Sequence, residues 1–320
     1  MTQPRITLTS AAQVIAAIPA ALRHVPTESI VVLAFTGKTL TFAARFDRVD
    51  VAAQAHKMTD VLRRHGIESV VIVTIADRPG KKAAAVENLV IAGILATAVE
   101  VIGTYWVPTL AEPVTAQDLD TLDTFDVDPI ASELAASTVE AGTVIEGSRT
   151  AIGNRYAHAE EIHPAEHADA AQVLEELAAV VYADELPDSG LIARTAAVIT
   201  ALPVRDAMFR LPLYGSTSAH TVMATIARHT RAEARIQALS IAGWLCHRAG
   251  DGAAANIAYD AAEDEATSAG IATPQMLRLL RQALDVAMSP TEIRTLDVDV
   301  DAETVRATTG AHLPGAPDRD

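Results

Sequence analysis

Two histidines and a glutamate stand in an order that can bind zinc. His163, Glu166 and His167 match the pattern H-x-x-E-H, which on a helix would place both imidazoles beside one metal ion and the carboxylate beside its bound water. Pro164 favours the first turn of a helix and would leave His163 outside it as a cap. A metal-dependent hydrolase is therefore the weakest functional hypothesis. The alternative is a polar linker, and we expect no bound metal.

A second candidate lies in the loop that follows an apolar run at residues 70–75. It contains Arg78, Gly80, Lys81 and Lys82, which gather three positive charges in an acidic chain. The loop should join the carboxyl end of a parallel strand to a helix. Open α/β sheets bind ligands there, and the amide groups of a helix N-terminus favour anions. Neither a Walker spacing nor G-x-G-x-x-G is present, so the alternatives are a small-anion (phosphate or nucleotide) site and an exposed turn.

Two arginine–aspartate pairs are candidates for a site or for structural ion pairs. Arg45 and Asp47 close a predicted strand, and Arg205 and Asp206 follow a predicted helix. Arginine and carboxylate groups at the ends of elements commonly form ion pairs that fix one element against another. We favour this structural role for both pairs.

The composition limits the partners of the chain. Asp plus Glu number 41 against 25 for Lys plus Arg, and the formal net charge of -16 over 320 residues opposes binding to DNA, RNA or an anionic membrane. The single cysteine, Cys246, allows no internal disulfide and no four-cysteine zinc site. No motif requires a cofactor. The first residues lack a basic segment followed by an apolar core, so we expect no signal peptide and a cytoplasmic location.

The first part of the chain predicts an α/β domain with a mixed sheet over residues 1–155. An unbroken apolar run between Pro26 and Gly37 indicates a strand buried on both faces. The short turn after it predicts an antiparallel hairpin, and the later alternation of strands and helices implies parallel pairing with right-handed crossovers. The expected strands are 30–35, 39–46, 70–75 and 99–107, and the expected helices are 11–17, 51–65, 82–97 and 128–140.

Residues 89–107 are apolar enough to suggest a membrane span. Glu100 and two glycines interrupt this run, so we interpret it as a buried helix at 82–97 followed by a strand. The Asp- and Thr-rich sequence after Pro108 predicts a long surface loop.

The second part predicts an α-helical domain over residues 165–290. Helical spacing begins at Pro164 and recurs in several segments. Around Gly250, the positions of Gly243 and Tyr259 resemble a tetratricopeptide helical hairpin, with a small residue where helices touch and an aromatic ring beside it. One copy does not make an array. Residues 291–320 predict an exposed acidic tail.

Several of these segments resemble the domain of unknown function 4192 family of high-GC Gram-positive bacteria and their phages. The likeness rests on the opening helix, Pro26, the strand from Ser29, and Arg45-x-Asp47, although the family's following Leu-Pro is absent here. It returns at Gly147-Ser148-Arg149, at Val204-Arg205-Asp206-Ala207 and between residues 238 and 284. The resemblance implies no activity, because the family has none assigned.

We therefore expect a cytoplasmic, non-enzymatic interaction or scaffold protein whose helical hairpins offer a groove to a protein partner. A homo-oligomer is compatible with the sequence. The first alternative is an enzyme or small-anion-binding protein that uses residues 78–82, and the second is the metal hydrolase.

Overall fold

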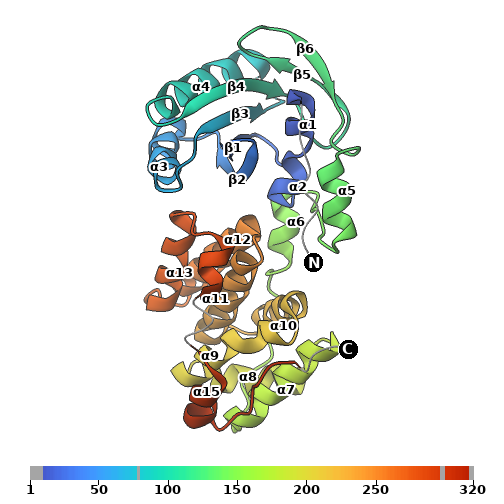
Figure 1. Ribbon diagram of the computed structural model, residues 1–320. Helices are drawn as coiled ribbons and strands as arrows, with labels where there is room; N and C mark the ends of the chain where they lie inside the picture. The colour runs from blue at the N-terminus through green and yellow to red at the C-terminus, as the bar shows by residue number, and fades with distance from the viewer. Residues whose placement is uncertain (1–9, 78–79, 296–299, 317–320) are drawn as a thin grey trace. The chain divides into compact units, whose positions relative to one another are not determined.

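The computed structural model describes residues 10–77, 80–295 and 300–316 (Figure 1). The chain divides into two compact units, Met1–Arg149 and Thr150–Asp320. Within the described residues, no helix combines the length and the apolar character needed to cross a membrane.

The described residues of the first unit form a six-stranded mixed sheet in the order β2-β1-β3-β4-β5-β6. β1 pairs antiparallel with both β2 and β3, β3 pairs parallel with β4, and β5 and β6 continue antiparallel. The expected hairpin and a parallel pair are therefore both present in a mixed sheet. The strands are β1 (Ser29–Thr36), β2 (Thr39–Asp47), β3 (Ser69–Ile75), β4 (Glu100–Val107), β5 (Val114–Asp118) and β6 (Thr124–Val127).

β1 is buried on both faces, as its apolar run predicts. Every residue from Ser29 to Phe35 is buried, because the strand has a neighbour on each side and helices cover the sheet. Val31 and Leu33 pack with residues of the first two helices, α1 (Ala11–Ala16) and α2 (Ile18–Leu22). By the alternation of a strand, Ile30 and Val32 point to the opposite face.

Two longer helices connect the strands. They are α3 (Val51–Arg64) and α4 (Gly80–Leu95), which pack against each other, and α4 also contacts β3 and β4. Figure 1 shows α4 lying along these strands. The carboxyl ends of β3 and β4 thus lie at the sheet edge where the loop preceding α4 begins.

The prediction of a long loop after Pro108 is wrong in part, because β5 and β6 form a hairpin there. Ala116 and Val127 are buried, while Thr115, Thr124 and Asp126 are exposed. The turn is held by Asp118, whose Oδ1 accepts hydrogen bonds from the amides of Asp120 (2.8 Å) and Thr121 (3.0 Å). Short strands with polar outer residues and an Asp-rich turn resemble a loop in composition. The helix expected from residue 128 is α5 (Glu133–Glu140).

The second unit is helical and is organised around α11 (Ala232–Arg248). Every residue of α11 from Ala234 to His247 is buried, and the helix contacts α8, α10, α12, α13 and α14. The other elements assigned from residue 149 on are α6 (Arg149–Asn154), α7 (Ala170–Ala183), α8 (Ser189–Val198), α9 (Leu202–Ala207), η1 (Met208–Leu213), α10 (Ser216–His229), α12 (Gly252–Ser268), α13 (Gln275–Asp285), α14 (Pro290–Thr295) and α15 (Ala302–Thr309).

The hairpin of α11 and α12 turns at Gly250, whose φ of 79° suits glycine. Gly243 lies against the ring of Tyr259, and a Cβ there would lie 2.6 Å from Cδ1 of that ring. The expected contact between a small residue and an aromatic ring is therefore present. The likeness to a tetratricopeptide hairpin remains a prediction.

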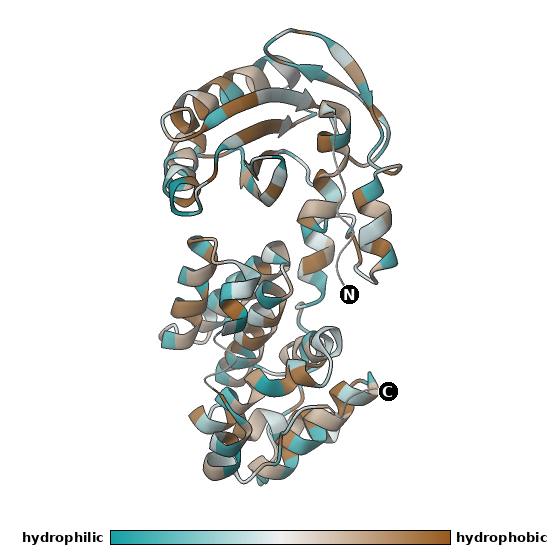
Figure 2. Ribbon diagram, viewed as in Figure 1, coloured by the Kyte–Doolittle hydropathy of each residue, from teal (hydrophilic) through white to brown (hydrophobic). Residues whose placement is uncertain are grey.

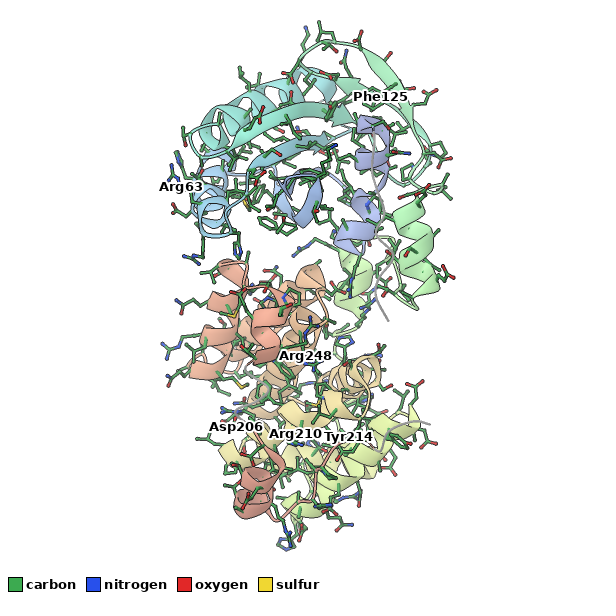
Figure 3. All side chains as sticks on the ribbon, viewed as in Figure 1. Arg63, Phe125, Asp206, Arg210, Tyr214 and Arg248 are labelled. Carbon is green, nitrogen blue, oxygen red and sulfur yellow. The ribbon has the colours of Figure 1, made fainter. Side chains whose placement is uncertain are left out.

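The prediction of an exposed tail at residues 291–320 is wrong in part, because some of these residues pack on the helical unit. Ala311 and Leu313 are buried. Arg210 donates hydrogen bonds to the carbonyl oxygens of Leu313 (2.8 Å), Val300 (2.7 Å) and Pro314 (3.2 Å), and Figure 3 labels this arginine beside Tyr214. Arg210 lies 90 to 104 residues before these three acceptors in the chain, so the acidic composition of the segment could not reveal the contact.

Candidate functional site

The loop predicted to bind an anion lies between β3 and α4. Arg78 and the side chain of Lys81 lie outside the described residues. Gly80 is the first residue of α4, and Lys82 is exposed. The position of this loop, between the carboxyl end of β3 and the start of α4, therefore agrees with the prediction from the sequence. Anion binding itself stays a prediction.

A cleft of about 430 Å³ opens at the same edge of the sheet. Three of the residues on its wall are acidic: Glu28, Asp77 and Glu112. Like charges repel an anion, most strongly where water is partly excluded. The acidic residues on the described wall of this cleft therefore disfavour the binding of phosphate.

Arg48 lies at this edge and was not identified from the sequence. Its side chain is 10% exposed, and its Nε and Nη2 donate to the two carboxylate oxygens of Glu87 in α4, at 2.8 and 3.0 Å. Its Nη1 donates to Glu28, whose other oxygen accepts from the amide of Asp77 at 2.9 Å. The hydrogen bond to Glu87 is the largest cause of a raised Arg48 pKa. Arg48 thus fixes α4 to the end of β2 and to the turn before β1.

The two arginine–aspartate pairs each lie within one stretch of chain. Arg45 and Asp47 are 2.7 Å apart on β2. Arg205 donates to the neighbouring Asp206 through Nε at 2.8 Å. Neither of these two contacts joins separate elements, because the partners are one or two residues apart. Arg48 does so, and its partners lie 20 and 39 residues away, beyond the reach of any local pattern.

The outer face of α4 is apolar and exposed, against the expectation of a buried helix at 82–97. The inner face carries Ala84, Asn88, Ile91 and Leu95, all buried against the sheet side. The side chains on the opposite face are uncovered: Val86 is 62%, Leu89 74% and Val90 41% exposed. An ideal Cβ on Gly93 would have no neighbour within 4 Å. Val86, Leu89, Val90 and Gly93 are called the α4 outer face below.

A helix that carries apolar side chains on two opposite faces is normally covered on both. Figure 2 shows hydrophobic colouring recurring along α4. The sheet covers only one side of α4. The buried residues recur at helical spacing on that side, and the exposed residues recur at helical spacing on the opposite side. The sequence revealed the apolar pattern but not that this chain leaves half of it uncovered.

The candidate zinc ligands do not share a helix. His163, Glu166 and His167 are exposed in irregular chain, and α7 begins only at Ala170, capped by Asp169. The helix expected from Pro164 thus starts later, because the aspartate carboxylate accepts from the amide of Gln172 and caps it there. Among the described residues, no three His, Cys, Asp or Glu side chains are grouped to hold a metal. The hydrolase hypothesis gains no geometric support.

A largely buried polar chain in the helical unit joins three titratable side chains. The hydroxyl of Tyr156 lies 2.8 Å from Nε2 of His220 and 3.6 Å from Sγ of Cys246. Burial raises the pKa of Tyr156 well above its ordinary value and lowers the pKa of His220 to about 4. Both groups are therefore neutral near pH 7. This suits a structural hydrogen-bond chain better than a nucleophile and its base.

Comparison with known proteins places the chain in a family. The model of the family described as domain of unknown function (DUF4192) matches residues 12–179 and 155–291. No curated protein and no solved structure matches the chain. The matched residues run from α1 to α14 and include both units. The chain therefore belongs to the family described as domain of unknown function (DUF4192).

Proposed function

We propose that this chain is a non-enzymatic interaction protein whose α/β unit binds a protein partner through the α4 outer face. The observation that carries the proposal is the exposure of Leu89, 74%, between two other exposed aliphatic side chains on the same helix. Isolated exposed leucines are common, but adjacent apolar side chains on one helix face are typical of interaction surfaces.

The helix is held rigidly enough to present such a face. Arg48 and Glu87 form a two-point hydrogen bond on one flank of α4, and Asn88 donates to the carbonyl oxygen of Tyr105 at 3.2 Å. Both contacts use residues that lie off the α4 outer face. A partner could therefore cover that face without breaking the contacts that orient the helix, which keeps the cost of binding low.

The proposal favours a protein over a small molecule because of the shape and chemistry of the face. It is a convex helix surface of aliphatic side chains, whereas small-ligand sites are concave and carry convergent polar groups. The cleft at the sheet edge is concave, but its described wall gathers carboxylates. The groove expected in the helical unit stays a prediction.

Site-specific photo-cross-linking tests this function. A photoreactive amino acid is placed at Leu89 and, as a matched control, at Leu279 of α13, a helical leucine that is 57% exposed. In extract of the native cells we expect a discrete adduct from position 89 and none of the same mass from position 279. Adding Val86→Asp to the chain that carries the photoreactive residue at position 89 should suppress the adduct from that position. Indistinguishable adduct patterns from the two positions would refute the proposal.

A further inference from the structure

The four positions of the α4 outer face are spaced symmetrically along the helix. Its centre falls between Leu89 and Val90, and Val86 and Gly93 lie equally far from that centre. In an antiparallel pair of identical helices, Leu89 of one copy would face Val90 of the other, and Val86 would face Gly93. The space above Gly93 is empty to 4 Å, so it can receive the valine side chain. Such self-complementarity is what a twofold interface requires.

The charges near this face favour the same arrangement. Among exposed residues between Val86 and Gly93 none is charged, because Glu87 is turned to Arg48. Lys82 is exposed in the first turn of α4, and Glu100 is exposed shortly after its last turn. An antiparallel copy places each lysine near the carboxyl end of the other helix, where the helix dipole is negative and Glu100 follows. A parallel copy would place the two lysines together.

We infer that the occupant of the α4 outer face is a second copy of this chain, packed with its α4 antiparallel about a twofold axis. The inference rests on the proposed function, because it names the partner of the same face. A single helix pair is small beside the roughly 1,200–2,000 Å² that stable interfaces bury. The dimer is therefore expected to dissociate in roughly the micromolar range. A net charge of -16 on each chain opposes it, so salt should strengthen it by screening.

Sedimentation velocity over a range of protein concentrations measures the self-association. The wild type should shift from monomer to dimer as concentration rises. Leu89→Glu should raise the dissociation constant at least tenfold, since it places a carboxylate at the centre of the apolar contact. Leu279→Glu is the matched control and should dimerise as the wild type does. Both variants should keep the wild-type melting curve at low concentration, because both side chains are exposed.

Cysteine cross-linking tests the orientation. Val86→Cys and Gly93→Cys chains are prepared separately, treated with a short bismaleimide, and then treated again as a mixture. The antiparallel pair predicts a strong cross-linked dimer in the mixture and weak ones in the separate samples. A parallel pair would give the reverse. The wild type, with only the buried Cys246, measures the background.

The outcomes separate this inference from the proposed function. A chain that stays monomeric at high concentration and high salt overturns self-pairing. So do cross-links that are stronger in the separate samples than in the mixture. If the photo-adduct at Leu89 then contains a different protein, the interaction function stands and only its occupant changes. If Leu89 gives neither dimer nor specific adduct, both proposals fail.

Discussion

α11 and α4 both carry apolar side chains on opposite faces, and they differ in what covers those faces. α11 is enclosed by helices of its own unit, so that every residue from Ala234 to His247 is buried. α4 has the sheet on one side and three exposed aliphatic side chains on the other. The comparison shows that an apolar pattern indicates that a helix must be covered. It does not indicate whether the cover comes from the same chain.

The two helices also use glycine differently. Gly243 of α11 lies where the ring of Tyr259 leaves no room for a Cβ, whereas Gly93 of α4 has open space above it. One glycine permits a contact within the fold. The other leaves a gap on the surface. Variants of both helices and of their surroundings can test the comparison.

The strongest perturbation removes the support of α4 while leaving α11 untouched. Val32→Asp places a carboxylate in a strand that is buried on both faces, at a cost of several kcal/mol against a typical stability of roughly 5–15 kcal/mol. Hydrogen exchange should become fast in β1, β3 and α4, and α11 should keep its protection. Wild-type protection of residues 29–36 would show that Val32 is not buried.

Acid should weaken the core around α11 through His220. Its pKa is lowered to about 4 by burial, with a further contribution from Arg155, against about 6.5 in an unfolded chain. The unfolded state therefore takes up the proton first. The stability from a neutral His220 is complete above about pH 6.5 and is lost as the pH falls to 4, by about 3 kcal/mol in all.

Denaturant unfolding across this pH range measures the effect. His220→Gln can keep a hydrogen bond to Tyr156 and cannot titrate, so its stability should fall less steeply between pH 6.5 and 4. Equal slopes for the variant and the wild type would assign the acid sensitivity to other groups.

Overfilling α11 should destabilise the helical unit. Gly243→Ala adds a methyl group against the buried ring of Tyr259, and overpacking of this kind costs roughly 1–3 kcal/mol. The free energy of unfolding should decrease accordingly in urea titration. If the variant were as stable as the wild type, α11 and α12 could move apart at little cost. That result would contradict the tight enclosure of α11.

The matched change in α4 should have the opposite sign and the smallest size. Gly93→Ala meets no neighbour and replaces a helical glycine with the best helix former, a gain of roughly 0.5–1 kcal/mol. The measurement is the free energy of unfolding at low protein concentration. A loss of stability would indicate that something already occupies the space above Gly93.

The sequence predicts the elements whose patterns are local. The strand at 30–35, the hairpin after it and the parallel pair around α4 follow from apolar runs bounded by proline and glycine. The α11–α12 hairpin follows from Gly250 and from the helical spacing on either side of it. In each case the residues that decide the structure are close together in the chain, so their order is enough.

The rest depends on distant partners or on short, mixed patterns. Arg48 has no feature that separates it from Arg45 until Glu28 and Glu87 are brought to it. β5 and β6 are short strands whose buried residues are too few for a clear alternation, and their Asp-rich turn suggests a loop. For the α4 outer face, the sequence shows apolar residues but cannot show which of them the sheet leaves exposed.

The hydrogen bonds of Arg210 bear on how freely the end of this chain can vary. Its guanidinium binds three main-chain carbonyl oxygens, on Val300, Leu313 and Pro314. Every residue type carries such an oxygen. Substitutions in this segment can therefore change its side chains without removing the acceptors that Arg210 needs. Among related chains we expect the sequence of this segment to vary while its backbone path is conserved. We expect Arg210 itself to be conserved.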